Sequence, residues 1–167
     1  MVERTLHEIN RLDESQFVQK LGNIYEESPW VAERVASDRP FETVEALRTA
    51  MQDVVDSASR ERKLELLRAH PDLGDQTGIT DASQEEQASA GLDQLTAEQY
   101  DAFERLNGRY QEKFGFPFIM AVKGASPSEV RDAMESRIEH SESAEFQTAL
   151  GEVHTIAKLR LDERFRS

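Results

Sequence analysis

Apolar residues recur at intervals of three and four positions along most of the chain, which is the spacing of an amphipathic helix. In the segment that follows Asp13, for example, Phe17, Leu21 and Ile24 share one helical face. The pattern predicts helices over approximately 15–27, 30–37, 41–55, 59–69, 83–92, 96–113, 126 onward and 143–165. In the last and longest of these, the inward face is formed by Phe146, Leu150, Val153, Ile156, Ala157 and Leu161.

The remaining pattern supports a wholly helical class. No segment shows strand-like alternation over a useful length, and the chain contains no internal repeat, linker or low-complexity run. We therefore expect an all-α fold, a helical bundle of about eight or nine helices. The length of 167 residues fits one core, so we expect residues 1–167 to form a single domain.

One segment departs from the helical pattern. The sequence FGFPFIMAVKG at 114–124 is too apolar for a surface loop and too rich in glycine, proline and aromatic residues for an amphipathic helix. It belongs either to the core or to the wall of a pocket.

Charge and composition exclude several function classes. Thirty-three acidic residues against twenty basic ones give a formal net charge of -13, which repels nucleic-acid phosphates, so we expect no nucleic-acid partner. The absence of cysteine excludes disulfides, thiolate nucleophiles and cysteine-ligated metals. His7, His140 and His154 have no metal-ligand spacing and are assigned to the surface or to packing, so we expect no metal.

The sequence also predicts a cytoplasmic location. No stretch approaches the length of an apolar membrane span, so no membrane association is expected. The first residues, MVERTLHEIN, lack the apolar segment of a secretory signal.

His70 stands at the predicted end of a helix, directly before Pro71, whose ring disfavours helical dihedrals at the preceding residue. The helix dipole favours a protonated histidine at this end, which suits a proton donor near neutral pH. The alternative is that His70 only caps the helix electrostatically. Pro71 and Gly74 of the sequence HPDLG then predict a turn that holds the imidazole at a rigid edge.

Ser83, Glu86 and Gln87 have the spacing that places three side chains on one side of a helix, where they can meet one ligand. The alternative is structural, since Ser83 and Glu86 also match a capping box, in which each satisfies a backbone amide of the other.

Arg160 lies between Leu159 and Leu161 on the last predicted helix. Such an arginine is either a surface residue whose stem covers the core, or a buried guanidinium that binds a planar pair of oxygens.

Four motifs in this order resemble the signature of the ureidoimidazoline decarboxylase family: HPDLG at 70–74, SQEEQASAGLD at 83–93, FGFPFIMAVKG at 114–124 and EVHTIAKLRL at 152–161. The sequence SPWVAERV at 28–35 also fits, and the resemblance runs from about residue 8 to residue 162. The loop GDQTGITDA at 74–82 is shorter than in some members, which leaves its geometry open.

The resemblance implies an all-helical homodimer that uses neither metal nor organic cofactor and decarboxylates a small ureidoimidazoline to (S)-allantoin. It implies catalytic roles for His70, Glu86 and Arg160, and substrate binding by Pro71, Ser83, Gln87, Phe116, Phe118 and Ile119.

Two other functions are compatible with the individual features. In a non-catalytic helical interaction protein, the histidine, the capping pattern and the aromatic segment are all structural. In a ureide hydrolase, Glu86 is a general base toward water, but such enzymes generally use a metal, for which the sequence offers no ligand cluster.

Overall fold

The computed structural model describes residues 2–74 and 80–165. Within these residues the chain forms nine helices and no strand, which confirms the predicted all-α class and helix number. The chain divides into two compact units, one made of Met1–Ala69 with His154–Ser167 and the other of His70–Val153. The expectation of one domain over residues 1–167 stays a prediction.

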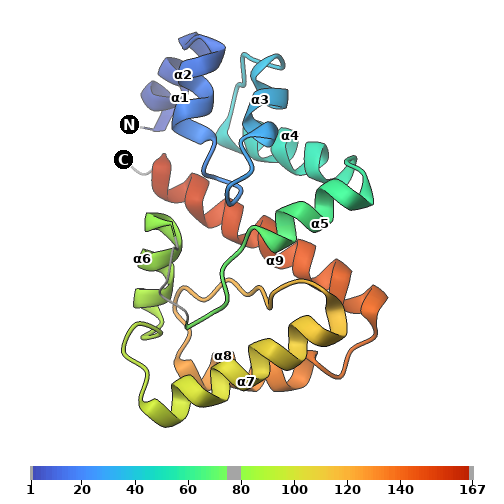
Figure 1. Cartoon of the computed structure of the whole chain (residues 1–167). Coiled ribbons are helices and arrows are strands. Elements are labelled where there is room, and N and C mark those ends of the chain that lie inside the picture. Colours follow the sequence, from blue (N-terminus) through green and yellow to red (C-terminus); the bar gives the residue numbers. More distant parts are fainter. Residues whose placement is uncertain (1, 75–79, 166–167) are drawn as a thin grey trace. The chain divides into compact units, whose positions relative to one another are not determined.

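The first unit contains the helices of the N-terminal part of the chain (Figure 1). They are α1 (Val2–Arg11), α2 (Glu14–Leu21), α3 (Trp30–Ala36), α4 (Val44–Asp56) and α5 (Arg60–Arg68), joined by the part of α9 (Glu142–Arg164) from His154 onward. Helix α3 packs against both α2 and α4. The side chains of Asp13, Thr43 and Ser59 begin α2, α4 and α5 by accepting a hydrogen bond from the backbone N–H three residues on.

Helix α2 is shorter than the sequence pattern predicts. It ends at Leu21, although Ile24 and Tyr25 continue the apolar spacing toward residue 27. Glu27 takes a positive φ of 43°, and Pro29 disfavours a helical conformation at the residue before it. Ile24 and Tyr25, which follow Gly22, are therefore buried side chains of a turn and not of a helix.

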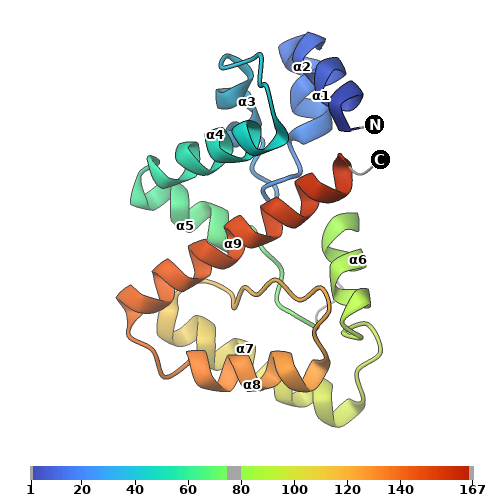
Figure 2. The same ribbon diagram turned by 180° about the vertical axis from the view of Figure 1, so that it is seen from behind.

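The second unit contains α6 (Asp81–Ser89), α7 (Ala97–Phe114), α8 (Pro127–Arg137) and the part of α9 (Glu142–Arg164) up to Val153. Figure 2 shows these helices from behind, with the irregular segment that links α7 to α8. Helices α7 and α8 pack against each other.

Helix α6 begins earlier than predicted, which corrects the interpretation of Ser83. Thr80 is the N-cap, and its hydroxyl accepts a hydrogen bond from the backbone N–H of Ser83 at 3.2 Å. Ser83 therefore lies inside the first turn and is not the cap of a capping box. A complete capping box is found instead at the start of α7, between Thr96 and Gln99.

The predicted apolar faces form the core with one exception. All six predicted inward residues of α9 are buried, as are Phe103, Leu106 and Tyr110 of α7. Tyr100 continues the apolar spacing of these residues toward the start of α7, but it is 47% exposed. It lies in the first turn of the helix, where the buried face has not yet begun.

The segment at 114–124 is buried along its middle, which fits both of the places expected for it. Gly115 ends α7 in the left-handed conformation, with φ 81°, and the chain then continues without regular secondary structure. Phe116, Phe118 and Ile119 are almost fully buried. Among the described residues, no helix is long and apolar enough to cross a bilayer.

Candidate active site

His70 lies in the first residues after α5, as the sequence predicts. The helix ends at Arg68 with Ala69 as its C-cap, and His70 follows as a bend before Pro71. Its side chain is largely withdrawn from solvent, since the residue is 8% exposed. A buried imidazole close to a helix C-terminus is suited to holding a proton in a fixed position.

The turn that follows His70 is held by three amide side chains. Gln87 Oε1 accepts a hydrogen bond from the backbone N–H of Gly74 at 2.9 Å, and Asn107 Nδ2 donates to the carbonyl of Leu73 at 3.0 Å. Gln111 Nε2 donates to Asp72 Oδ1 at 2.6 Å. Three successive residues of the turn are thus fixed by α6 and α7, which agrees with the predicted rigid edge.

Gly74 is required by this turn for two reasons. Its φ of 90° lies in the region that favours glycine, and a Cβ there would lie 3.1 Å from Leu95 Cδ1 and 3.3 Å from Phe103 Cδ2. Any side chain at this position would therefore strain the backbone and displace the apolar residues behind the turn. Residues 75–79 of the loop whose length differs from some family members lie outside the described residues.

The predicted trio lies on one helix. Ser83 and Gln87 are buried at 5% and 2% exposure, and Glu86 is half-buried, so α6 presents all three on its inner side. Gln87 links this face directly to the turn after His70. The structure thus brings the first two sequence motifs together.

Phe116, Phe118 and Ile119 lie in the same compact unit as His70 and α6. The Phe116 and Phe118 rings pack edge-on against Tyr110, with ring centroids 5.8 and 5.4 Å away. Their assignment as the wall of the substrate pocket stays a prediction.

Two alternatives were open for Arg160, a surface residue or a buried guanidinium, and the structure has the buried guanidinium. Residues of the same chain accept its hydrogen bonds. Its Nη2 lies 3.1 Å from Glu26 Oε2 and its Nη1 donates to the carbonyl of Asn23 at 3.0 Å. Glu26 is only 3% exposed. Arg160 belongs to the first unit and His70 to the second, so a shared catalytic role stays a prediction.

The sequence interpretation missed several residues that support these side chains. Glu26, Asn107 and Gln111 carry no motif of their own. Glu26 stands two residues before Ser28, at the edge of the SPWVAERV sequence, and that proximity was the only available signal. For Asn107, its position on the apolar face of α7, next to Leu106, was such a signal.

His154 is more than a packing residue. Its Nδ1 lies 2.9 Å from the Tyr25 hydroxyl and its Nε2 lies 2.9 Å from Asp56 Oδ1. Burial raises the pKa of Tyr25 well above its usual range, and the Asp56 carboxylate adds to this shift while Arg48 opposes it. The Tyr25 hydroxyl therefore stays protonated beside the turn that carries Glu26.

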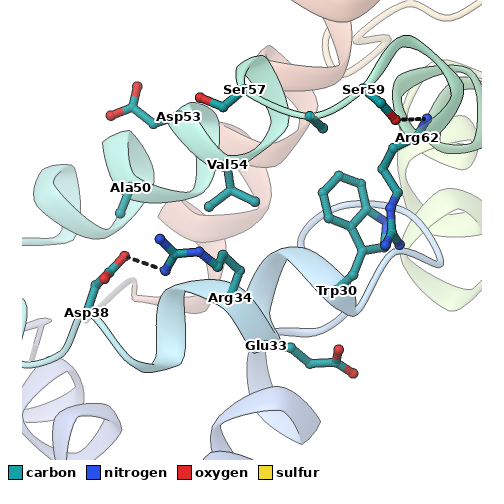
Figure 3. Close-up of a pocket in the computed structure, with 11 residues that line it drawn as sticks. Trp30, Glu33, Arg34, Asp38, Ala50, Asp53, Val54, Ser57, Ser59 and Arg62 are labelled. Atoms are coloured by element: carbon teal, nitrogen blue, oxygen red, sulfur yellow. Dashed lines mark hydrogen bonds and ion pairs between the residues drawn. The ribbon is translucent and has the colours of Figure 1, made fainter.

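Each unit has a hollow in its surface. One of about 780 Å³ in the first unit is lined by α3, α4 and the start of α5 (Figure 3). There the Arg62 guanidinium lies 4.7 Å from the centroid of the Trp30 ring, and Arg34 pairs with Asp38 at 3.5 Å. Charges of both signs line this hollow, so it favours no single ligand class.

The second hollow, of about 450 Å³, lies beside the turn after His70. It is lined by Asp72, Leu73, Gly74, Tyr100, Phe103, Glu104, Asn107, Gly108 and Gln111. In the part of the chain that the structure describes, no three histidine or acidic side chains are grouped as a metal site would require.

The arrangement is suited to proton chemistry on a bound polar molecule. A buried histidine at a rigid turn can exchange a proton with a ligand, while the helix that braces the turn presents a hydroxyl, a carboxylate and an amide. The aromatic segment of the same unit supplies apolar side chains of the kind that exclude water.

Comparison with known proteins identifies a family. Residues 10–162 match the family described as OHCU decarboxylase. The chain is 61% identical to 2-oxo-4-hydroxy-4-carboxy-5-ureidoimidazoline decarboxylase of Haloferax volcanii, covering 100% of this chain and 99% of that protein. It is 56% identical to the protein of the same name from Halalkalicoccus jeotgali, covering 98% and 93%.

A solved structure, the crystal structure of (S)-allantoin synthase, has a similar fold. It superposes with a TM-score of 0.78 at 35% sequence identity, over 95% of this chain and 53% of that one. The chain thus spans about half the length of the solved protein and nearly all of the two sequence relatives. Residues 10–162 match this family, and two of its named members are similar to the chain over nearly their full length. This chain therefore belongs to the OHCU decarboxylase family.

Proposed function

We propose that this chain decarboxylates 2-oxo-4-hydroxy-4-carboxy-5-ureidoimidazoline (OHCU) to (S)-allantoin, a step of urate breakdown, without a metal or an organic cofactor. Family membership and the names of its near full-length relatives support the reaction. The structural observation that carries the proposal is the 2.9 Å hydrogen bond between Gly74 and Gln87. It ties the turn that presents His70 to the helix that presents Ser83 and Glu86.

The reaction has two requirements. The bond between the ring carbon and the carboxylate must break so that its electron pair enters the π system of the ring and carbon dioxide leaves. A proton must then be added to carbon on one face only, which sets the handedness of allantoin. Both steps depend on holding the ring in one orientation.

His70 manages the proton in this proposal. It interacts with the hydroxyl or carboxylate of the substrate and then controls delivery to carbon, a role worth about 10²–10⁴-fold in rate. Its burial and the rigid turn keep the imidazole in one place during both steps. Pro71 fixes the direction in which the chain leaves His70.

Ser83, Glu86 and Gln87 orient the substrate through its ring and ureido groups. Gln87 Oε1 already accepts the Gly74 N–H, so its amide nitrogen is the group suited to a substrate carbonyl. Glu86 is an acceptor for ureido N–H groups. Phe116, Phe118 and Ile119 exclude water, which strengthens these polar contacts.

Arg160 acts on a ring or ureido carbonyl rather than on the leaving carboxylate. A cation paired with that carboxylate would stabilise the ground state more than the transition state. The buried Glu26 carboxylate at 3.1 Å supports this assignment, because it balances the charge of Arg160 and weakens its attraction for a second carboxylate.

A homodimer in the cytoplasm is the assembly and location that we propose with this activity, following the resemblance and the sequence. Light scattering on the purified protein, with a mass twice the 19.0 kDa of one chain, would support the dimer. Cell fractionation tests the location.

The test of the activity is to generate OHCU in the cuvette from urate with the two upstream enzymes and to follow circular dichroism in low and high salt. Rapid growth of the signal of one allantoin enantiomer on addition of this protein is the expected result. A trace no faster than spontaneous decay in every salt concentration would contradict it and favour a non-catalytic interaction protein. Release of ammonia in place of carbon dioxide would indicate the hydrolase.

A further inference from the structure

A buried carboxylate in the second unit gathers three side chains that the proposed mechanism does not use. Glu145 of α9 is 0% exposed. Its Oε1 accepts the Tyr110 hydroxyl at 2.6 Å and Arg137 Nε at 2.6 Å, and Arg137 Nη2 lies 2.5 Å away. His140 Nδ1 lies 3.0 Å from Oε2. Two hydrogen bonds, from Nε to Glu145 and from Nη1 to the Ile119 carbonyl, fix the plane of the Arg137 guanidinium.

The Arg137 guanidinium, fixed in this way, also contacts two residues of the aromatic segment at 114–124. Arg137 Nη1 donates to the carbonyl of Ile119 at 2.7 Å, and its Cζ lies 4.3 Å from the centroid of the Phe118 ring. One side chain of α8 thus contacts the backbone of one wall residue and the ring of its neighbour.

This contact matters because the segment lacks regular hydrogen bonding. A buried backbone carbonyl outside a helix or sheet needs a partner, and the Ile119 carbonyl finds it in a side chain. Phe118 is fully buried, so its ring position is set by Arg137 on one side and by Tyr110, 5.4 Å away edge-on. Burial and the hydrogen bond to Glu145 raise the pKa of Tyr110, which keeps its hydroxyl a donor.

We propose that Arg137, held by Glu145, is a positioning residue for the decarboxylase site, because it fixes the Ile119 carbonyl and the Phe118 ring of the pocket wall. The inference rests on the proposed function, in which these two residues line the site. Stability alone is a weak reason for such a pair, because buried ion pairs often contribute little compared with apolar replacements. A lysine cannot replace this arginine, because its single ammonium has neither the flat face nor the paired N–H groups.

The experiment compares Arg137→Lys with Arg131→Lys. Arg131 lies on the same helix and pairs with Glu135 at 3.0 Å on the surface, so its replacement is a matched control. Both variants are assayed at a temperature at which their far-ultraviolet circular dichroism equals that of the wild type. We expect Arg137→Lys to lower kcat/KM by about 10- to 100-fold, with a higher KM and weaker binding of allantoin. Arg131→Lys should change kcat/KM by less than about twofold.

A purely structural role gives a different result. Loss of folded protein lowers the maximal rate in proportion and leaves KM, allantoin affinity and the enantiomeric purity of the product unchanged, and this outcome would overturn the proposal. If Arg137→Lys does not fold, the wild type is titrated with allantoin and followed by NMR. Shifts of Arg137 Nε–H together with Phe118 and Ile119 support the proposal, whereas shifts of the two wall residues alone contradict it.

Fluorine NMR of fluorophenylalanine-labelled protein separates this proposal from the proposed function. Arg137→Lys should shift or broaden the Phe118 signal even if the wild type decarboxylates nothing. A wild type without activity refutes the function, whereas an active wild type with an unchanged Phe118 signal in Arg137→Lys refutes only the positioning role.

Discussion

The two compact units each bury one arginine against one glutamate, and they hold these pairs differently. In the first unit, Arg160 contacts Glu26 at 3.1 Å through one nitrogen and uses another for the Asn23 carbonyl. In the second, two nitrogens of Arg137 contact one oxygen of Glu145 at 2.6 and 2.5 Å, and Tyr110 and His140 also contact this carboxylate.

The difference separates two uses of a buried cation. Glu145 is surrounded by donors, so the Arg137 guanidinium is locked and suited to holding neighbouring chain in place. Glu26 lies 3.1 Å from Arg160, a longer contact than those between Arg137 and Glu145, and it balances the charge of the cation that the proposed function places on a substrate carbonyl.

The largest expected effect comes from neutralising the two carboxylates. Glu145→Gln should lower the free energy of unfolding by about 3–5 kcal/mol, because it leaves Arg137 buried without its counter-charge. Glu26→Gln should cost less, about 1–3 kcal/mol, because its contact with Arg160 is longer and Arg160 keeps its hydrogen bond to the Asn23 carbonyl. Urea unfolding at equal protein concentrations measures both. An equal or larger cost at Glu26 would remove the distinction between the two pairs.

The second effect is kinetic and concerns Arg160. Arg160→Lys should lower kcat by about 10²–10³-fold, the loss expected when a donor to developing charge is removed, with little change in KM. Arg164→Lys is the control, since Arg164 lies on the same helix, is exposed and donates to the carbonyl of Lys20. If the main change in Arg160→Lys is a higher KM, Arg160 binds the leaving carboxylate instead.

The smallest effect tests one donor to Glu145. Tyr110→Phe should lower the free energy of unfolding by about 1 kcal/mol, because Arg137 and His140 still contact the carboxylate. Tyr100→Phe is the matched control, because Tyr100 is exposed, and it should change stability by less than about 0.5 kcal/mol. Thermal melting measures the two variants, and equal values would indicate that the Tyr110 hydrogen bond adds nothing.

Much of this fold could be predicted because helical periodicity is a local signal. The spacing of apolar residues placed eight of the nine helices that the described residues form, and most of their inward faces, but missed α1. It extended α2 through Ile24 and Tyr25, since a buried turn can carry the same spacing as a helix. The capping pattern indicated Ser83 rather than Thr80 as the N-cap of α6, because both residues have the hydroxyl side chain that is preferred at this position.

The site was less predictable, because its support comes from residues distant in sequence. The motifs indicated His70 and Gln87, and the structure joins their segments across 13 residues. Only its place two residues before Ser28 indicated Glu26, 134 residues from Arg160, and nothing local indicated the contact between Arg137 and the Ile119 carbonyl. Such partners are set by packing, which no sequence spacing encodes.

The proton role of His70 is tested by the enantiomer-resolved decarboxylase assay on His70→Ala beside His7→Ala, in which an exposed histidine serves as the control. We expect His70→Ala to fold with unchanged far-ultraviolet circular dichroism and to lose about 10²–10⁴-fold of the rate of (S)-allantoin formation, while His7→Ala keeps the wild-type rate. Retention by His70→Ala of more than about a tenth of the wild-type rate would contradict the proton role of His70.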